Sequence, residues 1–165
     1  MDVEQMFMKY GAAMLRHARL MLGKDALCED AVQETLLRIM RTSSAPRDEA
    51  HEKAWLLTVT GNICRDFLRR RNRRREVAIP EWFDLPSGEA VPEEEVSLQD
   101  RDARLVQAVM NLPVKYREPV LLVYYHELSS KDAAQAMGLT GTAFRSRLMR
   151  AREMLRDALG EEILL

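Results

Sequence analysis

The sequence predicts an all-α protein built from two small helical domains joined by an acidic linker. Helix formers such as Leu, Ala, Met, Arg and Glu are abundant, whereas the 165 residues include only 7 glycines and 6 prolines. Aromatic residues amount to 6%, too few for a typical sandwich or barrel of aromatic and β-branched strands. The stretch 76–97 contains three prolines and no helical or strand periodicity. We therefore expect domains at 1–75 and 98–165, with 76–97 as the linker.

The first domain is expected to contain three helices. Apolar spacing and breaker residues predict them at 3–22, at 27–42 and from near Glu52 into a cluster of arginines. The inner side of the first helix carries Phe7, Met14, Ala18 and Met21. The polar stretch 43–51 is expected to be the loop between the second and third helices.

The second domain is expected to end in a helix-turn-helix. Its helices are predicted at 98–111, 114–127, 130–137 and 141–158. A short helix, a turn that contains Gly138, and a longer basic helix form the pattern of this DNA-binding motif. Pro119 is expected near the first turn of its helix or at a mild kink.

The predicted helix 141–158 has two different sides. Its apolar stripe consists of Phe144, Leu148, Ala151 and Leu155. The opposite side carries Thr142, Arg145, Ser146, Met149 and Arg150. Guanidinium groups bind guanine edges or phosphates, and hydroxyl groups suit either contact. A solvated arginine-rich face is the alternative, but a helix-turn-helix in front of it favours a nucleic-acid surface.

The net charge of −1 conceals blocks of opposite sign. Residues 65–75 carry seven arginines and one aspartate, whereas 76–102 carry nine acidic residues and one arginine. Asn62, Arg65 and Arg69 share a stripe of the third helix, and Asn72 and Arg73 continue it. Such segregation indicates separate surfaces for separate partners, one of them a polyanion or an acidic protein.

Membrane, redox and metal functions are disfavoured. No apolar run approaches the ~18–20 residues of a membrane span, and no secretory leader opens the chain, so we expect a cytoplasmic protein without direct membrane insertion. Cys28 and Cys64 are too few for a disulfide scaffold or a Cys-rich zinc site, and each is expected to pack as a small apolar side chain.

Two segments resemble a known family. DAVQETLLRIMR at 30–41 and AWLLTVTGNICRDFLRRR at 54–71 resemble region 2 of the extracytoplasmic-function (ECF) group of bacterial RNA polymerase sigma factors. The stretch 112–153 resembles the region 4 helix-turn-helix of the same group, most specifically through GT-x-x-RSRL-x-RAR at 141–152. The order of the two modules and the short linker also fit this group of sigma-70 family proteins.

The resemblance implies an alternative sigma factor, which binds core RNA polymerase and directs promoter-specific initiation without catalytic chemistry or a cofactor. A face with Asp30, Gln33 and Glu34 would bind the clamp helices of the polymerase β′ subunit. The −10 element would be engaged by the loop 43–53, where a flipped base is read, and by Asn62, Arg65, Arg69 and Arg73. The −35 element would be read by Thr142, Arg145, Ser146, Met149 and Arg150. The β flap and an anti-sigma factor are the other expected partners.

Two other classes of function stay open. A sigma-mimicking interaction module would sequester a regulator and would lack promoter affinity even with core polymerase present. A stand-alone helix-turn-helix repressor would read a palindrome as a dimer and would not need the polymerase. The basic character of both candidate DNA surfaces favours the sigma factor over the mimic.

Overall fold

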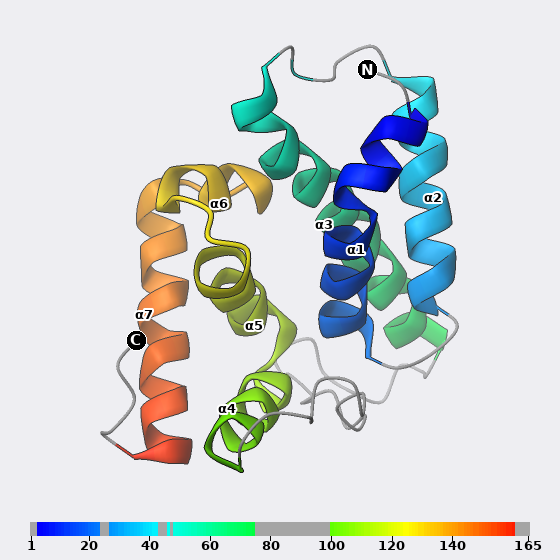
Figure 1. Cartoon of the computed structure of the whole chain (residues 1–165). Helices are drawn as coiled ribbons and strands as arrows, with labels where there is room; N and C mark the ends of the chain where they lie inside the picture. The colour runs from blue at the N-terminus through cyan, green and yellow to red at the C-terminus, as the bar shows by residue number, and fades with distance from the viewer. Residues whose placement is uncertain (1–2, 24–26, 43–45, 47, 75–99, 161–165) are drawn as a thin grey trace.

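The computed structural model describes residues 3–23, 27–42, 46, 48–74 and 100–160, and every regular element within these ranges is helical. The first half contains α1 (Val3–Leu22), α2 (Leu27–Arg41) and α3 (Glu49–Arg74). The second half contains α4 (Asp100–Asn111), α5 (Val114–Val120), the π-helix η2 (Leu121–Tyr125), α6 (Ser130–Ala136) and α7 (Gly141–Leu159) (Figure 1). The all-α prediction is confirmed, whereas the predicted linker 76–97 lies outside the described residues.

α3 begins earlier than the sequence predicted. Its first residue is Glu49 rather than Glu52, so the polar loop expected at 43–51 is shorter than proposed. Asp48 explains the early start, because its Oδ1 atom accepts a hydrogen bond of 3.0 Å from the backbone N–H of His51. This contact satisfies a donor that the first turn of a helix otherwise leaves without a partner.

The core of the first half is formed by the facing sides of α1, α2 and α3. Met14, Ala18 and Met21 are buried, as the helical spacing predicted. Phe7 was predicted on the same stripe, but it is 49% exposed. Its ring lies over Gly11, where an added Cβ would be 3.2 Å from the ring, while the neighbouring Met6 is buried instead.

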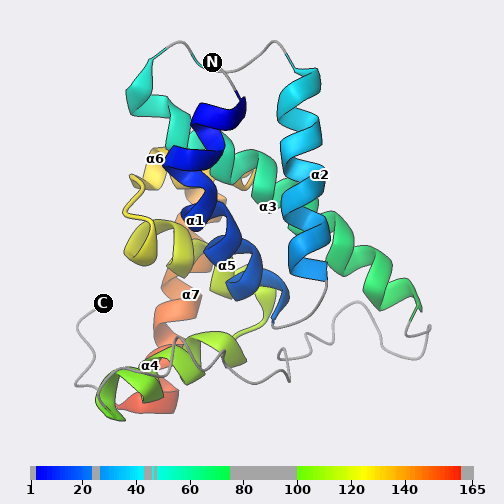
Figure 2. The same cartoon turned by 45° about the vertical axis from the view of Figure 1, so that its right-hand side comes forward.

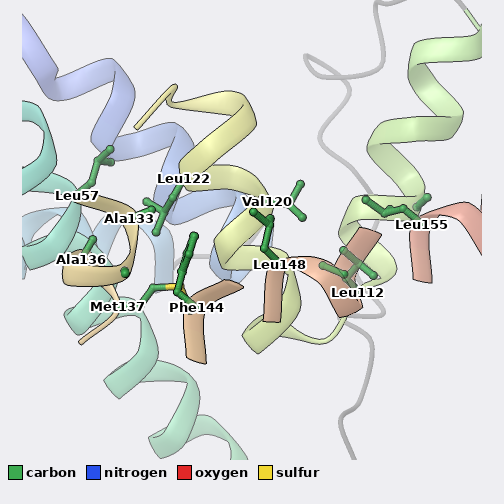
Figure 3. Packing of buried hydrophobic residues seen from close by; sticks show 13 residues of the cluster. Leu57, Leu112, Val120, Leu122, Ala133, Ala136, Met137, Phe144, Leu148 and Leu155 are labelled. Carbon is green, nitrogen blue, oxygen red and sulfur yellow. The ribbon is translucent and has the colours of Figure 1, made fainter. Parts of the chain in front are cut away.

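The core of the second half surrounds the inner side of α7. Phe144, Leu148, Ala151 and Leu155 are all buried, so the predicted stripe is confirmed (Figure 3). Small residues from α6 face this stripe: Ala133, Ala134 and Ala136. Their size leaves room for the fully buried Phe144 ring.

The helix predicted at 114–127 is irregular. Pro119 is buried in the second turn of α5, where it has no N–H to donate to the preceding turn. The chain then continues directly as η2, whose wider turn is closed by a 2.9 Å hydrogen bond from His126 N to Leu121 O. Glu127 follows with φ of 60°, which ends the helical run.

The two halves pack against each other. α3 contacts α6, and α1 contacts α5 (Figures 1 and 2). Leu57 of α3 is buried in the cluster around Phe144, and Leu121 of η2 is buried in the cluster around Ala18. Each half therefore contributes to the hydrophobic core of the other, a packing that the sequence did not predict.

No helix in the described ranges has the length and apolar character needed to cross a bilayer.

Candidate functional site

α6 and α7 form the predicted helix-turn-helix. Ser129 Oγ accepts a 3.1 Å hydrogen bond from Asp132 N at the start of α6. Thr140 Oγ1 accepts one of the same length from Ala143 N at the start of α7. Gly138 has φ of 66° in the turn between the helices, a conformation that favours glycine. The two caps and this glycine fix the angle at which α7 leaves the turn.

The outer face of α7 brings together the residues predicted to read DNA. They are all exposed: Thr142, Arg145, Ser146, Met149 and Arg150. Arg145 Nη2 donates to Thr142 Oγ1 at 3.4 Å, and Arg150 Nη1 donates to Glu153 Oε2 at 3.2 Å. Exposed contacts of this kind contribute about 0–1 kcal/mol, so both guanidinium groups can exchange them for phosphates or bases.

Arg152 is held against the fold. Its Nε atom donates a 2.7 Å hydrogen bond to the Tyr124 hydroxyl, and its guanidinium lies 5.6 Å from the centre of the Tyr124 ring. Arg152 therefore ties α7 to η2, unlike the exposed arginines of the outer face.

The basic stripe of α3 is exposed except at one residue. Asn62, Arg69 and Arg73 are exposed, whereas the Arg65 side chain is 19% exposed. Arg65 forms an ion pair with Glu118 and also donates to Asn62 Oδ1 and, at 3.3 Å, to Ala136 O. In this arrangement, Arg65 faces the second half of the chain rather than solvent.

The acidic side of α2 and the basic side of α3 border one groove. Asp30 and Gln33 are exposed on α2, and Glu34 is half-buried. Glu34 and Arg38 line the groove together with Asn62, Asp66, Arg69 and Arg70, and Ile63 and Phe67 form its apolar part. The structure thus brings Glu34, expected to bind protein, close to Asn62 and Arg69, expected to bind DNA.

The loop expected to read a flipped base is only partly described. Residues 43–45 and 47 lie outside the described ranges, and the rest of 43–53 includes the first turn of α3. Exposed His51 lies in this turn, with its Nδ1 atom 2.6 Å from Asp48 Oδ1.

The sequence did not predict a largely buried polar cluster between the two halves, although it placed one member, Arg65, on the DNA-binding stripe of α3. The cluster consists of His17, Lys53, Arg65, Arg117, Glu118 and His126. Arg117 Nη1 donates a 2.7 Å hydrogen bond to Leu20 O, across 97 positions of the chain. Polar residues on otherwise apolar helix faces were the available hint, because such groups are buried mainly when they find partners.

The two cysteines pack as predicted. Cys28 and Cys64 are free thiols, and both are buried in the core of the first half. Burial raises the pKa of the Cys64 thiol, with the Glu118 carboxylate acting in the same direction. A thiol of this kind is a poor nucleophile at neutral pH.

Two family models match separate parts of the chain. Residues 6–74 match the family model for sigma-70 region 2, and residues 102–155 match the model for sigma-70 region 4. The chain is 30% identical over 159 residues to the ECF RNA polymerase sigma factor SigE of Mycolicibacterium smegmatis, with 96% of this chain and 62% of the relative covered. The chain therefore spans less than two thirds of that relative.

A second relative and one solved structure are matched over more of their own length. The ECF RNA polymerase sigma factor SigL of Mycobacterium tuberculosis is 30% identical over 154 residues, which cover 93% of this chain and 86% of the relative. The structure of the sigma factor RpoE of Bartonella quintana, in complex with the anti-sigma factor NepR, matches with a TM-score of 0.72 and 25% identity, covering 97% of this chain and 98% of that one. The chain belongs to the ECF RNA polymerase sigma factors, alternative sigma factors that direct transcription initiation.

Proposed function

We propose that this chain directs core RNA polymerase to promoters by reading two DNA elements, the −35 element with α7 and the −10 element with α3. The observation that carries the proposal is the exposed face of α7. Its two exposed guanidinium groups, two hydroxyl groups and one thioether project from a helix whose other side is fixed in the core. A rigid helix with this chemistry suits direct readout in the major groove.

Binding of the −10 element is assigned to the exposed residues of α3. Asn62, Arg69 and Arg73 offer one amide and two guanidinium groups along one stripe. An amide can hydrogen-bond a base, and guanidinium groups hold the phosphates of a melted strand. Arg65 would join them only after the packing of α3 against α6 loosens, because Glu118 and the Ala136 carbonyl now hold it.

Binding of core polymerase is assigned to α2 and to the second half of the chain. Glu34 lines the groove between α2 and α3, and Asp30 and Gln33 are exposed on the same helix, which supports binding of the β′ clamp helices beside the −10 strand. The unit 98–165 would bind the β flap, as expected for region 4. The segment 76–97 would tether the units 1–75 and 98–165, so that binding of one DNA element raises the effective concentration of the other unit at its element.

An anti-sigma factor is the proposed negative regulator. Support comes from the similarity to RpoE, whose solved structure is a complex with the anti-sigma factor NepR. Sigma factors are transcription regulators rather than catalysts, and we propose that this chain has no catalytic activity of its own. Its place of action would be the cytoplasm, where it meets the polymerase.

Reconstitution with core polymerase tests the proposal. Wild-type chain plus core polymerase should start transcription at a small set of genomic sites that share two sequence elements. A matched reaction with Arg145→Ala/Arg150→Ala should lose these starts while the chain still binds the polymerase. Polymerase binding without any specific starts would instead indicate the mimic, and specific DNA binding by a dimer without polymerase would indicate the repressor.

A further inference from the structure

Two buried histidines meet where the halves of the chain pack together. His17 of α1 and His126, directly after η2, are 109 positions apart in the sequence. The Nδ1 atom of His17 lies 3.1 Å from the Nε2 atom of His126, and their ring centres are 4.9 Å apart. Both side chains are almost completely removed from solvent, so no water can readily replace either partner.

This contact needs one hydrogen and one lone pair. Two imidazole nitrogens at 3.1 Å form a hydrogen bond only if one of them is unprotonated. The second nitrogen of His17, Nε2, is buried and has no partner. In the favoured tautomer, His17 Nδ1 carries the hydrogen and donates it to His126 Nε2. His17 Nε2 is then a buried acceptor without a hydrogen bond, rather than a buried N–H donor without one. When both rings are protonated, two N–H groups face each other and the contact is lost.

The surroundings of the pair are mostly cationic. Lys53 Nζ donates a 2.8 Å hydrogen bond to the backbone carbonyl of His126, and Arg16 Nη1 donates one of the same length to the hydroxyl of Tyr125 beside it. The charged and titratable groups around the pair come from α1, α3, α5 and η2: Arg16, Lys53, Arg65, Arg117, Glu118 and Tyr125. Glu118 is the carboxylate among them, and it is already paired with Arg65. An added proton on either ring would thus enter a buried and cationic environment.

Both rings consequently resist protonation while the halves are packed. Burial lowers the pKa of His17 well below its usual value, and His126 and Arg65 act in the same direction. Burial lowers the pKa of His126 to about 4, assisted by Lys53. A histidine with a lowered pKa favours the packed state above its free value of about 6.5, and this contribution is lost as the pH falls below that value.

We propose that the His17–His126 contact is a proton-sensitive latch between the region 2 and region 4 halves. The latch holds α1 against α5 and η2 while both imidazoles are neutral, and it releases the two halves when they take up protons. Release separates α3 from α6 and exposes Arg65, which the packed arrangement ties to Glu118 and Ala136. The role of the exposed Arg65 in DNA binding depends on the proposed function, whereas the latch itself does not.

Energy transfer between dyes on the two halves of the full chain tests the latch. Cysteines introduced at exposed Met40 in α2 and exposed Arg156 in α7 would carry the dyes, because the native thiols are buried. Each histidine that must stay neutral shifts the equilibrium between packed and open states by up to ~10-fold per pH unit below its free pKa, so two histidines shift it by up to ~100-fold at about pH 5.5. Transfer should therefore fall between about pH 7.5 and 5, with the helical circular dichroism unchanged.

Non-titrating variants separate the latch from other groups. The double variant His17→Gln/His126→Gln should lose the pH-dependent fall in energy transfer, whereas the matched control His51→Gln, at an exposed position, should behave as wild type. A fall that persists in the double variant would overturn the latch and indicate another group, such as Glu118. Constant transfer in the wild type, or loss of helical signal together with the fall, would overturn it as well.

A second measurement covers the case in which the double variant does not fold. The wild-type chain has three histidines, so their imidazole resonances can be followed individually by nuclear magnetic resonance. His17 and His126 should take up protons together with the fall in energy transfer. Protonation of the pair without any fall in transfer would also overturn the proposal.

Discussion

Arg65 of α3 and Glu118 of α5 form an ion pair across the boundary between the two halves of the chain. The Glu118 side chain is 2% exposed, and that of Arg65 is 19% exposed. Burial raises the pKa of Glu118, and the Arg65 guanidinium opposes this rise. Arg65 therefore favours the charged form of a carboxyl group whose burial favours the neutral form.

Replacement of Arg65 by Met should destabilise the protein most at high pH. Loss of one partner of a buried pair costs ~3–5 kcal/mol, because the remaining charge is uncompensated. Without Arg65, the pKa of Glu118 should rise further, so the cost is present above that pKa and shrinks as falling pH neutralises the carboxyl group. Urea unfolding of Arg65→Met and wild type, followed by circular dichroism at about pH 8 and pH 5.5, measures both effects.

The double variant Arg65→Met/Glu118→Gln is the control. It removes the carboxyl group along with its partner, so it should recover much of the lost unfolding free energy, and its difference from wild type should depend little on pH. Equal destabilisation by Arg65→Met at both pH values would contradict this account of the pair.

Arg65 also shows which contacts cannot be predicted from the sequence. Periodicity placed Phe144, Leu148 and Leu155 in the core, because one helix face repeats every 3.6 residues whatever packs against it. It also placed Arg65 on the basic stripe of α3, but Glu118 is 53 positions away, and no local pattern encodes that contact.

Exposure at helix ends was similarly hard to predict. Phe7 has the same helical phase as Met14, yet near the start of α1 the buried position is that of Met6. The positions of the neighbouring helices α2 and α3 determine which residue near the start of α1 is buried. The spacing of apolar residues within α1 does not reveal these positions. The outer face of α7 was predictable because it lies opposite the apolar stripe of the same helix, and its residues are exposed within the described part of the chain.

Readout of the −35 element should depend on particular residues of α7. Arg145→Ala and Arg150→Ala should each weaken promoter binding by ~1–3 kcal/mol and relax the preference at particular base pairs. Arg156→Ala, at an exposed position in the last turn of α7, is the matched control and should weaken binding to all sequences evenly. Fluorescence anisotropy with a set of single-base promoter variants at fixed salt distinguishes the two patterns. Equal losses on every sequence for all three variants would mean that α7 contacts only the DNA backbone.

Binding of core polymerase should depend on the acidic side of α2. Asp30→Lys/Glu34→Lys should abolish co-purification with core polymerase. A polymerase surface that binds acidic side chains would repel the two introduced lysines. Glu4→Lys/Asp157→Lys changes the net charge equally at two exposed positions on α1 and α7, outside α2, and should bind as wild type. Both variants should remain helical by circular dichroism. Assembly of the first variant at wild-type affinity would remove α2 from the polymerase interface.

The acidic block 76–102 should compete with DNA for the basic end of α3. It carries nine acidic residues and directly follows the arginine cluster at 65–75, in which Arg69 and Arg73 are exposed. Residues 76–97, including Trp82, Phe83 and Leu85, lie outside the described ranges, so the competition is a prediction from charge alone. Pairs of exposed charges contribute about 0–1 kcal/mol each, which makes the expected inhibition modest.

Substitution of Glu93, Glu94 and Glu95 by serine tests this competition. The triple variant should bind fluorescent promoter DNA more tightly than wild type at low salt, because three charges that repel DNA and attract the arginines are gone. The gain should shrink towards about 0.5 M salt, where screening acts over only a few ångströms. A variant with Glu161 and Glu162 replaced by serine removes acidic charge at the other end of the chain and should gain less. If wild type and triple variant give the same binding curve at every salt concentration, the acidic block serves only as a tether, and the arginines of α3 are available to DNA from the start.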